Sequence, residues 1–169
     1  MATPIPGAPA HLQQGAPHGG VLLLLFKGRG DFLDYLIRLR TRSPYSHCEI
    51  MLPGGLCYTS HQMRGGVACI PRTLNDQWDV VPLHSLTAEQ VVAHYEKTKH
   101  HGYNWIGVIG CAIGISLPWP NRWHCSQWCA TVLGMRSTAG MSPGDVNRVL
   151  KRESTPSRPA ARHDIQEVV

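Results

Sequence analysis

The feature that most constrains the fold is a series of short apolar segments between residues 21 and 83, separated by glycine, proline or polar residues. The segments are VLLLLFKG (21–28), YSHCEIML (45–52), LCYTSHQ (56–62), GGVACIP (65–71) and WDVVPL (78–83). Short apolar segments rich in Val, Ile and Leu between turn residues are typical of buried strands. PGG at 53–55 predicts a turn, so the second and third segments should form a hairpin.

Helical patterns occur between the first two strands and again after residue 86. DFLDYLIRLRT (31–41) repeats apolar side chains at helical spacing and carries Arg38 and Arg40 at its end, where the helix dipole favours cations. YNWIGVIGCAIG (103–114) and CSQWCATVLG (125–134) predict two more helices. In the last helix one side is apolar: Trp128, Cys129, Val132 and Leu133. Strands followed by helices indicate an α+β fold.

A further helix is predicted after residue 86 because Thr87 and Gln90 have the spacing of a capping box. We expect Val91, Val92 and Tyr95 to form its inward face, and Gly102 to end it.

The composition indicates one folded domain over residues 21–151, in a chain of 169 residues with a net charge of +5. Residues 1–20, rich in Pro and Gly, predict a flexible arm, and residues 152–169 a polar tail. The modest charge and the lack of an aromatic and basic motif argue against nucleic-acid recognition. WIGVIGCAIGISLPW (105–119) is too short and interrupted for a transmembrane segment, so we expect a buried helix plus loop, with a segment that dips into a membrane as the alternative.

The N-terminal residues carry neither the charged region nor the apolar core of a secretory signal, which predicts accumulation in the cytoplasm of the producing cell. In that compartment the six cysteines of the chain are expected to be thiols rather than disulfides.

Cys125 is the cysteine best placed for chemistry because it falls at the first turn of a predicted helix. The helix dipole and unsatisfied backbone N–H groups lower the pKa of a thiol there and can hold an oxyanion. The structural alternative is a buried thiol that only packs. His124 is adjacent, but neighbours at a helix start point apart.

The predicted hairpin identifies a partner among the ten histidines of the chain. If 53–55 is a three-residue turn, His47 faces His61 and Glu49 faces Thr59, with all four on one face of the sheet. Cys48, Ile50 and Leu52 then form the other, more apolar face. The structural alternative is a row of polar residues that face solvent, and a one-residue slip in register would separate the set.

A zinc site is a competing interpretation, since Cys125, Cys129, His47 and His61 could supply four ligands. However, Cys-x-x-x-Cys within a helix lacks the Cys-x-x-Cys spacing of structural zinc sites. No glycine-rich phosphate-binding motif is present either. We therefore expect neither a metal nor another cofactor.

The motifs YSHCEI, YTSHQMRGGV, GYNWIG and WHCSQWCATVLG, in this order, resemble the circularly permuted branch of the NlpC-like, papain-like cysteine amidase and peptidase superfamily. The pattern is similar in particular to small proteins encoded by bacteriophages and prophages, and covers residues 21–150. The resemblance implies an antiparallel sheet packed against helices, with Cys125 as nucleophile and His47 as general base. It leaves the third, orienting residue open: His61 fits the pairing, and Thr59 and Glu49 are alternatives.

The resemblance implies a cysteine hydrolase acting on a peptide, with peptidoglycan stem peptides as the leading substrate, carried in a virion or released at lysis. An acyltransferase or esterase acting on a lipid or thioester is the second choice, with Trp119, Trp123 and Trp128 lining an apolar cleft. The alternative from another functional class is a virion tail or baseplate protein on the same fold, which would contact other virion proteins through its termini.

Overall fold

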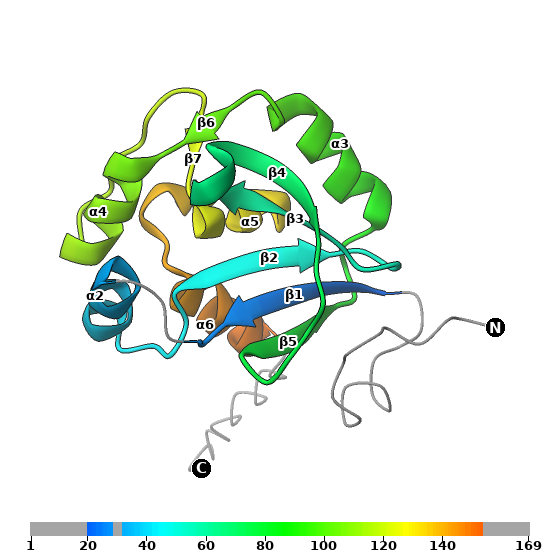
Figure 1. Ribbon diagram of the computed structural model, residues 1–169, viewed down its shortest axis with the longest axis horizontal. Coiled ribbons are helices and arrows are strands. Elements are labelled where there is room, and N and C mark those ends of the chain that lie inside the picture. Colours follow the sequence, from blue (N-terminus) through cyan, green and yellow to red (C-terminus); the bar gives the residue numbers. More distant parts are fainter. Residues whose placement is uncertain (1–19, 29–31, 154–169) are drawn as a thin grey trace, which may run out of the picture.

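The computed structural model describes residues 20–28 and 32–153 of the chain (Figure 1). The expected arm lies outside the described residues except for Gly20, and the expected tail lies outside them beyond Glu153. The described part has the predicted α+β class, with a mixed seven-stranded sheet and helices around it.

Strands β1 to β5 correspond to the five apolar segments of the sequence; β5 has the bounds of its segment, and the other four are slightly shorter than theirs. Their bounds are β1 (Val21–Phe26), β2 (His47–Met51), β3 (Leu56–His61), β4 (Gly66–Pro71) and β5 (Trp78–Leu83). Two short strands that the sequence pattern did not predict, β6 (Gly102–Tyr103) and β7 (Arg122–Trp123), complete the order β5-β1-β2-β3-β4-β6-β7. Neighbouring strands pair antiparallel, except that β6 and β7 are parallel.

The β2–β3 hairpin has the predicted register. The residues paired across it are Ile50 with Tyr58 and Met51 with Cys57. Continued along both strands, this register sets His47 opposite His61, as predicted. The alternate residues of β2 and its end belong to the main apolar core, as predicted: Cys48, Ile50 and Leu52. The length of the PGG turn sets this register and therefore determines which side chains of the hairpin lie on the polar face.

The helices are α2 (Phe32–Thr41), α3 (Ala88–Thr98), α4 (Trp105–Ile113), α5 (Cys125–Val132) and α6 (Pro143–Glu153). In Figure 1, α5 and α6 lie behind the sheet, whereas α2 and α4 pack against each other at one end. The main core lies between the sheet and α5, where Trp128 and Cys129 are fully buried. Val132 and Leu133 pack partly buried against that core, so the predicted apolar side of α5 is confirmed.

The second face of the sheet is covered by the chain itself. The connection between β4 and β5 crosses in front of β1 and β2 (Figure 1). A smaller apolar cluster forms under it, with Leu74 of this connection and Trp78 of β5 packed on residues of β1, β2 and β3: Leu22, Leu24, Met51 and Cys57. This cover also encloses the polar residues that share the face.

Two details of the predicted α3 are wrong. The helix ends at Thr98 with Lys99 as its C-cap, and Gly102 belongs to β6 instead. Val92, expected to face inward, is 37 % exposed, whereas Val91 is fully buried and Tyr95 packs against the core as predicted. Consecutive helical residues differ by about 100° in direction, so Val91 and Val92 cannot share a narrow buried face.

Helix α6 lies largely within the predicted domain but was not predicted. Its start is a reciprocal cap in which Ser142 Oγ accepts from the Asp145 N–H at 3.1 Å and Asp145 Oδ2 accepts from the Ser142 N–H at 3.0 Å. The Ser-x-x-Asp spacing at 142–145 was a signal for this helix. Over residues 20–28 and 32–153, none of the helices has both the length and the hydrophobicity to span a membrane.

The predicted capping box of α3 is present and gives a test of the fold. Thr87 Oγ1 accepts from the Gln90 N–H at 3.3 Å, and Gln90 Oε1 accepts from the Thr87 N–H at 2.9 Å. Thr87→Ala leaves the Gln90 N–H without this acceptor, so we expect the free energy of unfolding to fall by about 1 kcal/mol in urea denaturation. Ser85→Ala, at an exposed position outside the helix, is the control and should change it little. Equal effects of the two substitutions would contradict the capping role.

Candidate active site

Cys125 is the first residue of α5, and its side chain is nearly buried, with 6 % of the residue exposed. The helix starts here because His124 caps it: His124 Nδ1 accepts from the Gln127 N–H at 3.4 Å. His124 Nε2 donates to the Ala139 carbonyl at 3.3 Å. Both ring nitrogens of His124 have partners in the fold, and His124 also hydrogen-bonds with Cys125, which lowers the pKa of the thiol.

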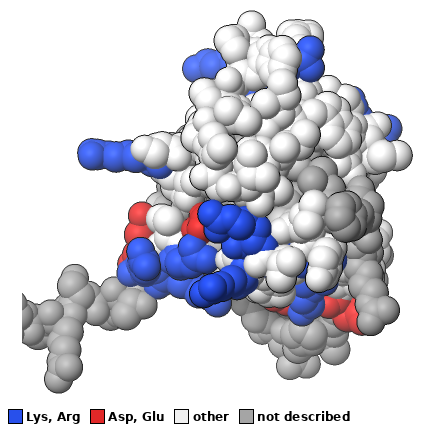
Figure 2. Space-filling model, turned by 90° about the vertical axis from the view of Figure 1, so that its left-hand side faces the viewer, with Lys and Arg blue, Asp and Glu red and all other residues white. Residues whose placement is uncertain are grey.

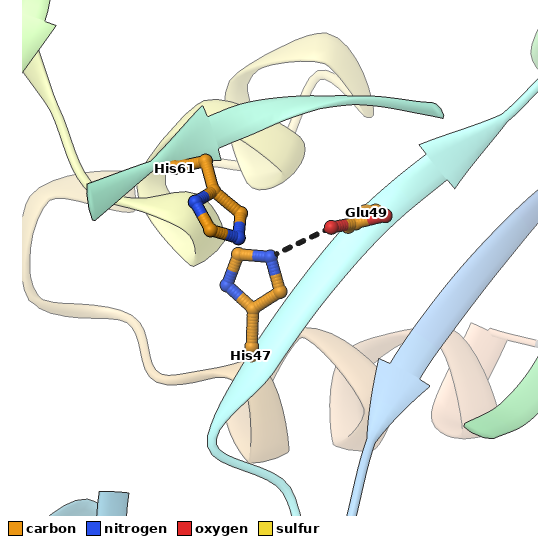
Figure 3. A group of neighbouring side chains, drawn as sticks. All are labelled: His47, Glu49 and His61. Atoms are coloured by element: carbon orange, nitrogen blue, oxygen red, sulfur yellow. Dashed lines mark hydrogen bonds and ion pairs between the residues drawn. The ribbon is translucent and has the colours of Figure 1, made fainter. Parts of the chain in front are cut away.

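His47, at the start of β2, is the imidazole next to Cys125. Its Nε2 lies 3.0 Å from Glu49 Oε1, two residues further along the same face of the strand (Figure 3). The other ring nitrogen, Nδ1, points away from Glu49 (Figure 3). His47 also interacts with Cys125 by hydrogen bonding and charge. Since Nε2 is occupied by Glu49, Nδ1 is the nitrogen that remains for the thiol.

Glu49 is a fully buried carboxylate held from two sides. Arg72, in the connection that covers this face, donates from Nε to Glu49 Oε2 at 3.0 Å and from Nη2 to Oε1. Burial raises the pKa of Glu49, but the hydrogen bonds and charges of His47 and Arg72 outweigh burial and lower it to about 2. Glu49 is therefore ionised at neutral pH and provides a fixed negative charge beside His47.

The environment of His47 favours the imidazolium. Burial lowers the pKa of His47, but its interactions with Cys125 and then with Glu49 outweigh burial and raise the pKa to about 10. A thiolate on Cys125 and a positive charge on His47 thus stabilise each other, and Glu49 adds to the effect.

The pKa of Cys125 is raised, which differs from the lowered value that a helix N-terminus predicts. The main cause is a hydrogen bond to the Cys48 thiol, which stabilises the protonated form, and burial acts in the same direction. The charge of His47 opposes both. Cys48 was predicted only as part of the apolar face, and its effect on Cys125 depends on how α5 packs against β2.

His61 lies beside His47 but does not make the orienting hydrogen bond. The two rings meet edge to face with their centroids 5.3 Å apart. His61 Nδ1 accepts from the Met63 N–H at 3.2 Å, so its Nε2 carries the proton when the ring is neutral. Burial, and then the charge of His47, lower the pKa of His61 to about 4. His61 is therefore a neutral neighbour that presents an N–H donor.

Of the three candidates for the orienting residue, Glu49 is the one that makes a hydrogen bond with His47. Thr59, the other alternative to His61, is buried and donates from Oγ1 to the Cys48 carbonyl at 2.9 Å. Glu49 can reach His47 because alternate residues of one strand share a face, and the partner that keeps it charged, Arg72, is 23 positions further along the chain.

Cys125, His47 and His61 line one pocket of about 190 Å³. The rest of its lining is mixed: the apolar part includes Phe26, Ile37, Trp78, Tyr103 and Val108, and the polar part includes Asp34, Gln62 and Arg72. Other tryptophans were expected to line this pocket. Instead, Trp128 is buried in the core, Trp123 stacks on His101 and Trp119 is 45 % exposed. The tryptophan of the pocket is Trp78, because the β4–β5 connection crosses this face and brings the start of β5 beside β1 (Figure 1).

The arrangement favours proton transfer over metal binding. Among the described residues, the potential ligand atoms that converge, all within 4.8 Å of one another, belong to His47, Glu49 and His61. Arg72 donates to both carboxylate oxygens of Glu49, so a positive charge already compensates this carboxylate. Cys129, the remaining member of the zinc set considered from the sequence, donates to the Cys48 carbonyl within the core at 3.6 Å.

Comparison with known proteins adds no identification: no protein-family model matches the chain, and no curated protein is significantly similar to it in sequence. Inference about function therefore depends on the geometry of the pocket.

The contact between Cys48 and Cys125 gives a test by pH titration. Cys48→Ala removes the hydrogen bond that stabilises the Cys125 thiol, so the pKa of Cys125 should fall and its alkylation should begin at a lower pH. The measurement is the rate of iodoacetamide labelling of Cys125 from neutral to alkaline pH, followed by peptide mass spectrometry. Cys69→Ala, at a half-buried thiol on β4, should leave the curve in place. An unchanged curve for Cys48→Ala, or a shift to higher pH, would contradict the assigned contact.

Proposed function

We propose that the protein is a cysteine hydrolase in which Cys125 is the nucleophile and His47 is the general base. The observation that carries this proposal is the line of interacting groups Arg72, Glu49, His47 and Cys125, which ends at the start of a helix in a pocket. A nucleophile, a base and a group that orients the base are the parts that covalent acyl transfer needs.

In the proposed mechanism, the reactive form of the pair carries one proton, which His47 holds as the imidazolium, and the Cys125 thiolate attacks the carbonyl carbon of an amide or ester. The N–H groups of Cys125 and Ser126 precede the first backbone hydrogen bond of α5, from Trp128 N–H to the His124 carbonyl. They can therefore donate to the oxyanion of the tetrahedral intermediate. The His47 imidazolium then protonates the leaving amine or alcohol as the carbon–nitrogen or carbon–oxygen bond breaks, which leaves an acyl-enzyme.

Hydrolysis of the acyl-enzyme completes the proposed cycle. His47 removes a proton from water, the oxygen attacks the thioester carbonyl, and the carbon–sulfur bond breaks. The proton stays on His47, which restores the ion pair with the Cys125 thiolate, and the product is a carboxylic acid. Glu49 stabilises the imidazolium in both halves of the reaction and, through its bond to Nε2, keeps Nδ1 directed at sulfur.

The geometry also supports a circularly permuted papain-like fold as our proposal for the architecture. The strand that carries His47 precedes the helix that carries Cys125 in the chain, and α5 packs directly against β2 and β3. Within the superfamily that the sequence resembles, a peptide is the leading substrate class, and peptidoglycan stem peptides fit a phage-encoded enzyme.

A second candidate is transfer or hydrolysis of an acyl ester. It is favoured by the apolar part of the pocket, where Phe26, Trp78 and Val108 present more hydrocarbon than hydrogen-bonding groups to a substrate. The chemistry at Cys125 would be the same, and the two candidates differ in the leaving group and in the side chain or acyl chain that the pocket accepts.

The first test of the proposal is trapping of the acyl-enzyme. Incubation with a set of peptide p-nitroanilides and acyl p-nitrophenyl esters should give an adduct on Cys125 that intact-mass and peptide mass spectrometry detect. Cys125→Ala should abolish the adduct and lower turnover by about 1000-fold or more, whereas Cys69→Ser should retain both. Adduct formation on other cysteines only, or turnover that survives in Cys125→Ala, would refute the proposal.

The role of Glu49 as a positioning residue is tested by the pH profile of the same reaction. We expect activity to rise with pH as the doubly protonated Cys125–His47 pair loses its first proton. Activity should fall again near pH 10, where the His47 imidazolium loses its proton. Glu49→Gln removes an anion that raises the pKa of His47, so the descending limb should move to lower pH, and kcat should fall by about 100-fold or more. Glu96→Gln, at an exposed ion pair on α3, is the matched control. A Glu49→Gln enzyme with reduced kcat but an unshifted descending limb would limit Glu49 to a structural role.

A further inference from the structure

Helix α4 packs its small residues inward and its large ones outward. Its buried residues include Gly107 and Gly110, whose added Cβ atoms would lie 2.4 Å from Asn104 Nδ2 and 2.5 Å from the Ile115 carbonyl oxygen. Side chains larger than hydrogen therefore do not fit at these positions unless neighbours move. The exposed residues are the large ones: Trp105 (50 %), Ile106 (41 %), Ile109 (51 %) and Ile113 (56 %). A helix that only covered a core would show the opposite pattern.

This apolar surface extends beyond α4. Ile115 and Trp119 follow the helix and are 52 % and 45 % exposed, and α2, which packs against α4, adds Tyr35 and Leu39 at 55 % and 61 %. We call these eight residues the apolar patch: Tyr35, Leu39, Trp105, Ile106, Ile109, Ile113, Ile115 and Trp119. Contiguous exposed apolar surface of this kind marks a docking site more often than a surface that only faces water.

Arginines border the apolar patch on one side. Figure 2 shows a group of Lys and Arg side chains below a broad uncharged surface, on the face formed by α2 and α4. Arg40, Arg42 and Arg148 line a groove of about 600 Å³ there, together with Leu39 of the patch. The acid in this lining is Asp145, which is paired with Arg148. Arg40 lies against Gly114, at the C-terminal end of α4, so positive charge directly adjoins the apolar helix.

We propose that this face docks on the surface of a bilayer that contains anionic phospholipids. Exposed Trp and Ile side chains are suited to the boundary between headgroups and acyl chains, and arginines at their border are suited to lipid phosphates. Charge complementarity favours this occupant over a second copy of the chain, which would bring the same arginines together. Helix α4 has nine residues and is too short to span a bilayer, so it would lie in the interface.

The docking would also orient the pocket. Val108 and Cys111, on the inner side of α4, line the same pocket as Cys125 and His47. With the outer side of α4 in the interface, the pocket lies one helix thickness from the lipid. Docking itself does not depend on the thiol, so Cys125→Ala should bind membranes like the unmodified protein.

The test is co-sedimentation with vesicles of phosphatidylcholine alone and of phosphatidylcholine mixed with phosphatidylglycerol. We expect binding to the mixed vesicles that weakens as salt is raised, and much weaker binding to phosphatidylcholine. Ile109→Asp should reduce the bound fraction several-fold, and Val92→Asp, at an exposed apolar residue on α3, should not. Arg40→Glu with Arg42→Glu should remove the preference for the anionic lipid. Tryptophan emission should shift to the blue on binding, and the double substitution Trp105→Phe and Trp119→Phe should abolish this shift while binding remains.

Three results would overturn the proposal. The first is an absence of binding to the mixed vesicles at low salt. The second is equal loss of binding in Ile109→Asp and Val92→Asp. The third is a concentration-dependent dimer in size-exclusion chromatography that Ile109→Asp dissociates, without vesicle binding, because the apolar patch would then belong to an interface between copies of the chain.

Discussion

The buried carboxylate of Glu49 is the group on which the arrangement of the site depends. A charge with no exposure to water is tolerated only where partners compensate it, and here Arg72 and His47 both do so. Arg72 in turn lies over the ring of Trp78, with its guanidinium carbon 5.3 Å from the ring centroid. These contacts join three segments. Glu49 links the start of β2 to Arg72 of the β4–β5 connection, and Arg72 in turn contacts the start of β5. The same contacts that close this side of the sheet also set the charge and the direction of His47.

The relation between α5 and β2 supplies the other half of the site. Cys125 reaches His47 because α5 packs on β2 with Trp128, Cys129 and Cys48 at the interface. Cys48 faces the core, and its thiol holds that of Cys125 in the protonated form, whereas His47 favours the thiolate. The pKa of Cys125 is therefore set by two opposing neighbours, His47 and Cys48, which are consecutive residues of β2. In the proposed reaction, formation of the Cys125 thiolate has to overcome the contact with Cys48.

Sequence patterns predicted those parts of the architecture that depend on residues close to one another in the chain. The PGG turn determined the register that sets His47 opposite His61, and alternation then identified Cys48 and Ile50 as core residues. The Thr87 capping box and the apolar side of α5 likewise follow from spacing within one element. Cys125 at a helix start was visible for the same reason.

The features that sequence did not predict depend on contacts between distant segments. The importance of Glu49 follows from Arg72, which reaches it from another part of the chain, and Trp78 lines the pocket only because the β4–β5 connection folds back. The exposure of Ile109 and its neighbours could not be inferred from hydrophobicity, since the apolar segment of α4 predicts a buried helix. Helix α6 was missed although Ser142 and Asp145 mark its start. The distinction between peptide and acyl-ester substrates likewise depends on the shape of a pocket that several elements build together.

The charge states of His47 and His61 can be measured directly by NMR titration of their imidazole nitrogens. We expect His47 to stay protonated through neutral pH and to titrate near pH 10, because of Cys125 and Glu49. We expect His61 to titrate near pH 4, with its neutral form protonated at Nε2. If His47 titrated at or below the usual value of about 6.5, the ion pair with Cys125 and the role of Glu49 would both be contradicted.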